Sequence, residues 1–140
     1  MALLEKQLYV KKSTIPNAGK GLFTKKAISK GERIIEYRGK ITAWKVVKND
    51  DHNPYIFYIT RNHVINAQNH LKVLARYAND ARGLTRITGI TNNAEFVVDK
   101  KLKRAFIEAK KNIPAGAEIL VGYGKEYWDI IRYNIKIGKE

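Results

Sequence analysis

The 140-residue sequence contains no cysteine and only three histidines. The absence of cysteine excludes disulfides, thiolate metal sites and a cysteine nucleophile. The histidines, His52, His63 and His70, lack the close spacing of a histidine-rich metal site, so we expect no bound metal. No apolar run approaches the length of a membrane span, and the N-terminus lacks the apolar core of a signal peptide. We therefore expect a soluble, intracellular protein.

Acidic residues are also scarce, because 13 aspartates and glutamates stand against 27 lysines and arginines, a formal net charge of +14. This excess predicts contact with nucleic acid or with an acidic protein face. The alternative is a basic surface that only serves solubility, because the basic residues are spread along the chain. Hydrophobic residues make up 44% of the chain, enough for one core, and we expect a single domain over residues 1–140.

Short apolar runs between turn residues predict a domain built mostly from strands. The clearest run is 55–60, rich in aromatic and β-branched residues, which is expected to pair with 63–67 across an Arg61-Asn62 turn. The other expected strands are 6–11, 22–24, 33–37, 94–99, 104–109 and 119–121. Short helices are expected at 42–47, at 125–133, and in a turn capped by Asn69 with Leu71, Leu74, Ala75 and Ala78 on one face.

Two stretches share one pattern. Residues 28–31 (Ile-Ser-Lys-Gly) lead into Ile34-Ile35, and residues 113–116 (Ile-Pro-Ala-Gly) lead into Ile119-Leu120. Each pattern is a turn that ends in glycine and feeds an apolar strand. We expect two similar corners in one sheet system.

Two glycine-containing stretches are candidates for chemistry. Gly19-Lys20-Gly21 alone lacks the third glycine of a dinucleotide fingerprint and the end of a phosphate-binding loop, so in isolation it is interpreted as a glycine turn. Tyr123 lies between Gly122 and Gly124, which leaves its hydroxyl unshielded by neighbouring side chains. The alternative is a tyrosine that only ends a strand.

A third stretch combines a cation, an aromatic ring and an amide in Arg76-Tyr77-Ala78-Asn79. With Gly19 to Phe23 before it, and Asn92-Asn93-Ala94 and Glu118 to Gly124 after it, the chain resembles the SET-domain family of protein lysine methyltransferases from Leu8 to Trp128. That family is marked by a Gly-x-Gly loop, an Arg-Phe-x-Asn-His-Ser-Cys-x-Pro-Asn segment and a Gly-Glu-Glu-Leu-x-x-x-Tyr segment. The resemblance implies a β-clip fold, mainly β with short helices, several small sheets and a threaded, pseudoknot-like C-terminal segment.

The chain departs from the family pattern in one region. Tyr77 replaces the usual Phe, Asp80 stands where the family has His, and Ala81-Arg82 replace Ser-Cys. A loop over 83–91 is inserted, and the cysteine-rich zinc-binding tail of some members is absent. Asp80 either weakens cofactor binding or pairs with Arg82. These departures leave open a catalytically silent SET-like module that binds nucleic acid or protein, or a chance match by an unrelated small basic β domain.

The resemblance implies S-adenosylmethionine as methyl donor, with S-adenosylhomocysteine as product, and a lysine ε-amine of a protein as acceptor. It implies that the Asn79 side-chain carbonyl accepts a hydrogen bond from the cofactor's ammonium, while Lys20 or Arg76 offsets the cofactor's carboxylate. Trp128 is a candidate for the adenine face, or else a core residue. The residues expected to bind the cofactor are Gly19, Lys20, Gly21, Leu22, Arg76, Tyr77, Asn79, Asp80 and Trp128.

Tyr123 is the expected catalytic residue, with its hydroxyl aimed at the reacting centre, and no histidine base is needed. Aromatic side chains are expected to line the channel for the substrate lysine. Strand alternation puts Tyr55 and Phe57 on one face and Tyr58 on the other, so either tyrosine is a candidate. Phe96 and Tyr123 complete this set, although at least one of these aromatic residues must belong to an ordinary core.

The substrate is expected to be a histone or another DNA-associated protein, or an acidic protein that presents one lysine. The chain is expected in the cytoplasm, or associated with the nucleoid or chromatin. Histone tails are basic, so a +14 enzyme would repel them unless its channel rim is locally acidic. Candidates for that rim are Glu36, Asp50, Asp51 and Glu95. The small Val121 leaves the number of transferred methyl groups open.

Overall fold

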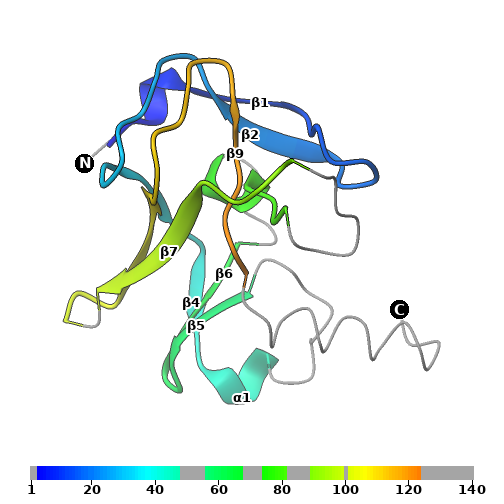
Figure 1. The fold of residues 1–140 in the computed structure, drawn as a ribbon. Coiled ribbons are helices and arrows are strands. Elements are labelled where there is room, and N and C mark those ends of the chain that lie inside the picture. Colours follow the sequence, from blue (N-terminus) through cyan, green and yellow to red (C-terminus); the bar gives the residue numbers. More distant parts are fainter. Residues whose placement is uncertain (1–2, 48–55, 68–73, 82–88, 100, 124–140) are drawn as a thin grey trace.

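The computed structural model describes residues 3–47, 56–67, 74–81, 89–99 and 101–123 (Figure 1). The strands are β1 (Leu8–Lys12), β2 (Lys20–Thr24), β3 (Arg33–Tyr37), β4 (Lys40–Thr42), β5 (Ile56–Thr60), β6 (His63–Asn66), β7 (Ala94–Asp99), β8 (Arg104–Ala109) and β9 (Glu118–Ile119). The helical elements are α1 (Trp44–Val47) and two 3-10 turns, η1 (Glu5–Gln7) and η2 (Leu74–Tyr77).

These strands form three small antiparallel sheets, with the orders β1-β2-β9, β3-β8-β7 and β4-β6-β5 (Figure 1). The predicted architecture, mainly β with several small sheets and short helices, is therefore confirmed. Among the described residues, no helix is long and apolar enough to cross a membrane.

Several predicted elements have the expected bounds. β3, β7 and β8 begin and end where the sequence predicts, and β5 pairs with β6 across the Arg61-Asn62 turn. β1 begins at Leu8 rather than at residue 6, because η1 occupies the preceding residues. The final strand is shorter than predicted: β9 ends at Ile119, and the next two residues make only isolated bridges.

The sequence analysis missed β4. No strand was expected between residues 37 and 55, but Lys40 begins a strand that pairs with β6. Because Thr42 ends that strand, the helix predicted from residue 42 begins only at Trp44. The helix predicted over 125–133, and the positions of Asn69 and Leu71, lie outside the described residues.

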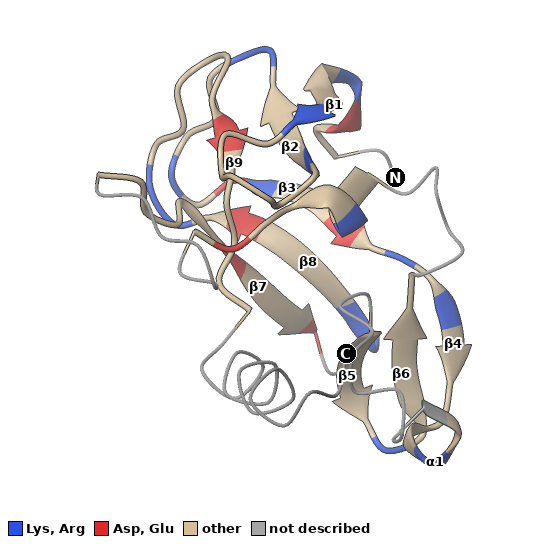
Figure 2. Ribbon diagram, turned by 90° about the vertical axis from the view of Figure 1, so that its right-hand side faces the viewer, with Lys and Arg blue, Asp and Glu red and all other residues tan. Residues whose placement is uncertain are grey.

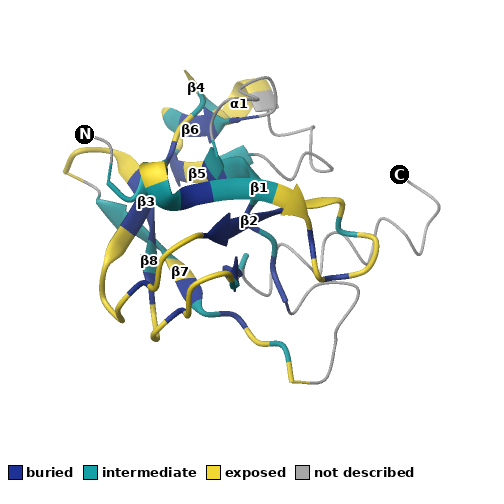
Figure 3. Ribbon diagram, turned by 90° about the horizontal axis from the view of Figure 1, so that it is seen from above, coloured by how far each residue is buried: buried dark blue, intermediate teal, exposed yellow. Residues whose placement is uncertain are grey.

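The core lies where the sheets meet (Figure 3), and most of its largest buried side chains are aliphatic. The strand β2 is buried on both faces. Leu22 faces the core. Phe23 lies on the opposite face of the strand, where it is buried under Tyr9, with ring centroids 5.6 Å apart. The largest fully buried side chains are Phe23, Leu22, Ile28, Ile34, Ile35, Ile107, Ile113, Ile119, Val64, Val121 and Thr24.

The two similar corners predicted from the sequence lie against each other. The backbone groups of Ile28 and Ile113 exchange two hydrogen bonds of 2.8 Å. Gly31 and Gly116 take φ values of +90° and +83°, which side chains disfavour. The corners were expected in one sheet system, but they feed β3 and β9, which belong to different sheets. Their mutual bridge therefore ties the two sheets together.

The C-terminal segment after β9 lies between two segments from earlier in the chain. Leu120 forms a parallel bridge with Asn79, and Val121 forms one with Ala94. The side chain of Asn93 fixes the same segment, because its amide donates to Glu118 O and its carbonyl accepts from Leu120 N, both at 2.9 Å. This seating corresponds to the threaded segment that the sequence predicts, and it brings Tyr123 beside the residues that follow η2.

Gly39, between β3 and β4, has no room for a side chain. A Cβ there would lie 2.4 Å from the carbonyl oxygen of Asn66 and 2.8 Å from the nitrogen of Ala67. Both are backbone atoms at the end of the β4–β6 ladder, so they can move only if that pairing is disturbed. We expect Gly39→Ala to lower the free energy of unfolding by about 1–3 kcal/mol, measured by urea denaturation.

Gly122→Ala is the matched control for this stability prediction. The nearest atom to its added Cβ is Asn92 Nδ2 at 3.5 Å, an ordinary contact distance. We expect this change to stay within about 0.5 kcal/mol. Equal losses for the two variants would contradict the steric account of Gly39.

Candidate active site

Aromatic side chains from separate strands surround one small pocket. Tyr37 comes from β3, Phe57 from β5 and Phe96 from β7, and Tyr123 follows β9. The rings of Phe57 and Phe96 are 4.8 Å apart between centroids, and those of Phe96 and Tyr123 are 6.3 Å apart. The pocket has a volume of about 70 Å³. Its lining residues are Tyr37, Ile56, Phe57, Ala75, Arg76, Ala78, Phe96 and Tyr123.

The structure brings together Phe57, Phe96 and Tyr123, three residues predicted to line the lysine channel. It does not place Tyr58 there. That side chain is 49% exposed on the opposite face of β5 and makes an edge contact with Trp44, at 5.6 Å between ring centroids. Strand alternation explains the difference, since Phe57 already faces the pocket. Tyr55 lies outside the described residues.

Tyr37 was missed by the sequence analysis. It ends an apolar strand, Ile34-Ile35-Glu36-Tyr37, which looks like ordinary core. Its place in the pocket follows from the pairing of β3 with β8 and of β8 with β7, which sets its ring 5.9 Å from that of Phe96. No local pattern in the sequence predicts which strands pair in this way.

Tyr123 is held at both ends by the segment after η2. Its hydroxyl donates a hydrogen bond to the carbonyl oxygen of Ala78 at 2.5 Å, and its backbone nitrogen donates to Asp80 Oδ2 at 2.8 Å. The ring therefore has a fixed orientation along the pocket wall.

Asp80, the main departure from the family pattern, has a structural partner as well. Its carboxylate is only 6% exposed, and Oδ1 accepts a 2.8 Å hydrogen bond from Asn92 Nδ2. The Asn92 carbonyl in turn accepts from Ala81 N at 2.8 Å. Asp80 thus links the backbone of Tyr123 to the Asn92 side chain. The predicted pairing with Arg82 lies outside the described residues.

The two glycines at the start of β2, Gly19 and Gly21, are explained by different structural features. Gly19 takes a φ of +70°, and nothing lies within 4 Å of where its Cβ would be. Gly21 has ordinary backbone angles, but a Cβ there would lie 2.2 Å from Glu118 Oε2. That carboxylate accepts hydrogen bonds from the Ser13 hydroxyl at 2.7 Å and from the Thr14 hydroxyl at 2.6 Å. Gly21 therefore makes room for Glu118, a role that the sequence did not indicate, and its cofactor contact stays a prediction.

Asn79 lies directly beside this loop. Its side-chain nitrogen donates to the carbonyl oxygen of Lys20 at 3.0 Å, with a weaker contact of 3.5 Å to Glu118 Oε2. The nitrogen is thus occupied, and the side-chain oxygen has no donor among the described residues. An acceptor beside the glycine loop suits the ammonium group of a bound amino-acid cofactor.

The remaining predicted cofactor residues are scattered. The side chain of Leu22 is fully buried in the core, so the cofactor contact predicted at this position falls to its backbone. Arg76 lines the aromatic pocket, donates to the carbonyl oxygen of Ala67 at 2.9 Å and lies over the ring of Tyr77 at 5.3 Å. Trp128 lies outside the described residues.

These features define a small β domain whose aromatic pocket is closed by a threaded C-terminal segment. The chain belongs to the SET-domain family, whose model matches residues 19–124. Members of this family are generally S-adenosylmethionine-dependent protein lysine methyltransferases. The predicted family membership is therefore confirmed.

Among solved structures, a chain in the crystal structure of an active polycomb repressive complex 2 in the basal state is similar, with a TM-score of 0.66 and 25% sequence identity. The match covers 84% of the present chain and 15% of the other, so the present chain corresponds to a small part of that protein. No curated protein sequence matches this chain.

Proposed function

We propose that the protein is a protein-lysine N-methyltransferase that transfers a methyl group from S-adenosylmethionine to a lysine ε-amine of a protein substrate. One arrangement carries this proposal. The segment Ala78 to Asp80 holds Tyr123 in the aromatic pocket on one side, and presents Asn79 to the glycine loop on the other. The three consecutive residues Ala78 to Asp80 therefore connect the pocket proposed for the substrate lysine with the group proposed to accept a hydrogen bond from the cofactor's ammonium.

The described residues fit the cofactor at the loop side. Bound S-adenosylmethionine supplies a methyl group on a positively charged sulfur. The Asn79 side-chain oxygen would accept from the cofactor's ammonium, and Gly19 leaves open space beside it. Lys20 is exposed on the same loop and can offset the carboxylate, whereas Arg76 lies at the aromatic pocket. Lys20 is therefore the better placed of the two predicted partners.

The aromatic pocket suits a lysine side chain. A free lysine amine has a pKa of about 10.4 and is protonated at neutral pH. Aromatic faces attract the cation as it enters, while the mostly apolar walls disfavour the charged form and so lower the pKa of the bound amine. The hydroxyl of Tyr123 donates to Ala78, and its oxygen can still accept a hydrogen bond from the amine. That contact would point the nitrogen lone pair along the pocket.

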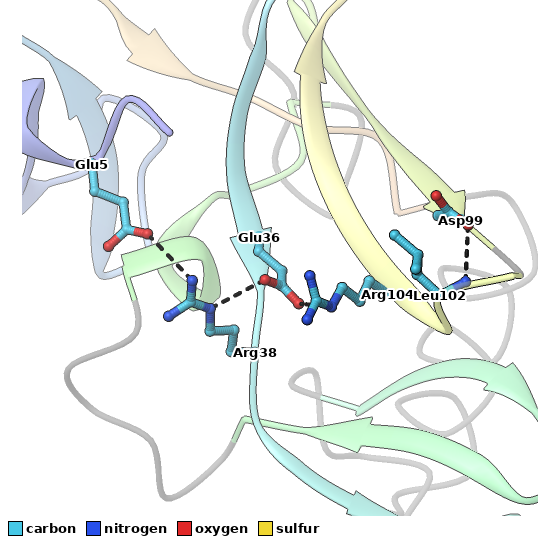
Figure 4. Close-up of polar contacts among 6 residues, drawn as sticks. All are labelled: Glu5, Glu36, Arg38, Asp99, Leu102 and Arg104. Atoms are coloured by element: carbon cyan, nitrogen blue, oxygen red, sulfur yellow. Dashed lines mark hydrogen bonds and ion pairs between the residues drawn. The ribbon is translucent and has the colours of Figure 1, made fainter. Parts of the chain in front are cut away.

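The charge distribution bears on the choice of substrate, which we propose is a histone or another DNA-associated protein. Glu36, one expected acidic rim residue, already pairs with Arg38 at 3.3 Å and Arg104 at 3.7 Å (Figure 4). Glu95 remains exposed, and Asp50 and Asp51 lie outside the described residues. With Glu36 neutralised, a substrate presented on an acidic partner such as DNA meets less repulsion than a free basic tail.

Cofactor binding gives the first test of the proposal. Calorimetry should show that S-adenosylmethionine binds the wild-type chain. Asn79→Ala should weaken binding by about tenfold to a hundredfold, because a hydrogen bond to a charged group contributes about 1.5–3 kcal/mol. Asn62→Ala, at an exposed turn position, is the control and should leave the dissociation constant unchanged.

Two other outcomes have distinct meanings. Absence of cofactor binding by the wild-type chain would refute the enzyme proposal. Binding without transfer of a radiolabelled methyl group to any protein of the source cell would instead identify a catalytically silent SET-like module.

A further inference from the structure

Arginine and lysine behave differently in the described part of the chain. Each ion pair found there uses an arginine: Arg33 with Glu108 at 2.9 Å, Arg38 with Glu36 and Glu5, and Arg104 with Glu36. No described lysine forms an ion pair with a described carboxylate. Arg33, Arg38 and Arg104 therefore neutralise acidic residues of the protein itself, whereas no described carboxylate neutralises the described lysines, whose charge can act on an external partner.

Five of these lysines line two hollows near β1. Lys6, Lys25 and Lys26 surround a hollow of about 370 Å³. Lys11 and Lys111 line a second, groove-like hollow of about 460 Å³, together with polar groups such as the Thr14 and Asn112 side chains. We call these five lysines the lysine face. None of them lines the aromatic pocket.

The two hollows lie next to each other along the same sheet. Tyr9 and Lys11 point to the outer face of β1 by strand alternation, and Gln7, just before the strand, lines the first hollow. At about 3.3 Å per residue, the strand from Leu8 to Lys11 spans about 10 Å, the axial rise of roughly three base pairs. Figure 2 shows lysine and arginine segments on the strands and loops around β1 and β2, and further ones on β4, on β8 and near α1.

The backbone fixes the spacing of the two hollows. Gly116, which lines the groove, donates its N–H to the carbonyl oxygen of Thr24 at 2.7 Å, and the next residue, Lys25, lines the other hollow. The side chain of Gln7 donates to the Thr24 hydroxyl and to the carbonyl oxygen of Lys26, both at 3.2 Å. The lysines thus extend from a cross-linked corner of the fold.

We propose that the lysine face binds the phosphate backbone of duplex nucleic acid. Lysine ammonium groups act as point charges on phosphate, and closely spaced phosphates match cations that no described carboxylate neutralises. Lys111 donates a hydrogen bond to the Thr91 hydroxyl at 2.8 Å, which fixes its position and leaves its charge in place. Among the described lining residues of the groove, the one carboxylate is Glu118, which is 6% exposed and accepts hydrogen bonds from Ser13 and Thr14. Its oxygens therefore point at these inner donors, and Lys11 and Lys111 outnumber its single negative charge in the same groove.

The same residues predict binding without sequence preference. Bidentate base recognition uses planar side chains such as arginine, and no arginine of the described ranges lines either hollow. The aromatic ring in the groove, Phe23, is only 2% exposed and lies under the Lys11 ammonium at 4.5 Å, so bases cannot stack on it. Phosphate contacts of this kind position a protein on nucleic acid but do not read its sequence.

The test compares two double variants with the same change of charge. Fluorescence anisotropy would follow binding of a labelled 20-base-pair DNA duplex of mixed sequence at low salt. Lys11→Glu with Lys111→Glu should reduce affinity at least tenfold and make the dependence of log affinity on log salt shallower by about 2, since each phosphate contact contributes about 0.9. Lys40→Glu with Lys45→Glu, on β4 and α1, should reduce affinity less than threefold.

Several outcomes would overturn the proposal. Equal losses for the two double variants would show that only net charge matters, and failure of the wild-type chain to bind DNA would exclude nucleic acid. Competition by poly-glutamate stronger than that by DNA would assign the lysine face to an acidic protein. The milder double variant Lys11→Gln with Lys111→Gln should also lose affinity. Circular dichroism of each variant shows whether a loss of binding is due to misfolding. S-adenosylmethionine calorimetry on the same variants separates this proposal from the methyltransferase proposal, because the lysine face does not depend on cofactor binding.

Discussion

Replacing Tyr123 with phenylalanine is expected to lower the rate of methyl transfer by about a hundredfold or more while cofactor affinity stays within about twofold. Loss of one positioned hydrogen-bonding group in an active site typically costs about 10²–10³ in rate. The variant keeps the ring that packs beside Phe96, but it loses the hydroxyl that bonds to the carbonyl oxygen of Ala78 and that we propose accepts a hydrogen bond from the substrate amine. Radiolabelled methyl transfer measures the rate, and calorimetry measures the affinity.

Tyr58→Phe is the matched control for this experiment. It removes the same atom from a tyrosine that is exposed on the opposite face of β5 and contacts Trp44 rather than the pocket. Its transfer rate should equal that of the wild-type protein. If both variants retain full activity, Tyr123 is not the catalytic residue. If both lose it equally, the loss has another cause than the pocket.

Asp80→Asn is expected to impair both stability and methyl transfer, and a second substitution is expected to restore them. The carboxylate of Asp80 accepts hydrogen bonds from Tyr123 N and from Asn92 Nδ2. An amide at position 80 can accept only one of these and turns its own N–H groups toward the other donor. A buried donor left without an acceptor costs about 1–3 kcal/mol. The free energy of unfolding should fall by a similar amount, and Tyr123 should lose its fixed position.

The double variant Asp80→Asn with Asn92→Asp exchanges the two groups. The amide at position 80 can then accept from Tyr123 N and donate to the carboxylate at position 92, which still accepts from Ala81 N. We expect the double variant to regain most of the stability and activity lost by either single variant. A double-mutant cycle by urea denaturation gives the coupling energy. Additive losses would show that the Asp80–Asn92 contact does not position Tyr123.

This network changes the interpretation of the departure at position 80. The sequence analysis identified Asp80 as the point where the family pattern fails, and offered weakened cofactor binding or a pair with Arg82 as explanations. The structure shows a third role, because the carboxylate joins the last active-site segment to Asn92. Its partner is 12 positions away, beyond a loop whose path no local pattern predicts.

Local sequence patterns correctly predicted the strands whose own residues favour a strand. The strands β3, β7 and β8 are apolar or β-branched runs between turn residues, and their bounds were correct. The strand β4 was missed because Gly39 and Lys40 look like a break, and only pairing with β6 makes a strand of Lys40–Thr42. Non-local pairing also places Tyr37 in the pocket. Motif spacing located Asn79 and Tyr123, but the register between strands was needed to choose Phe57 over Tyr58.

The central claim is that the aromatic pocket accepts a lysine side chain for methylation. The most direct measurement is mass spectrometry of source-cell proteins incubated with the purified chain and isotopically labelled S-adenosylmethionine. We predict label on lysine ε-amines with the wild-type chain and with Tyr58→Phe, and little or none with Tyr123→Phe. Label that is absent with the wild-type chain, that appears on a residue other than lysine, or that is unchanged by Tyr123→Phe would contradict the account.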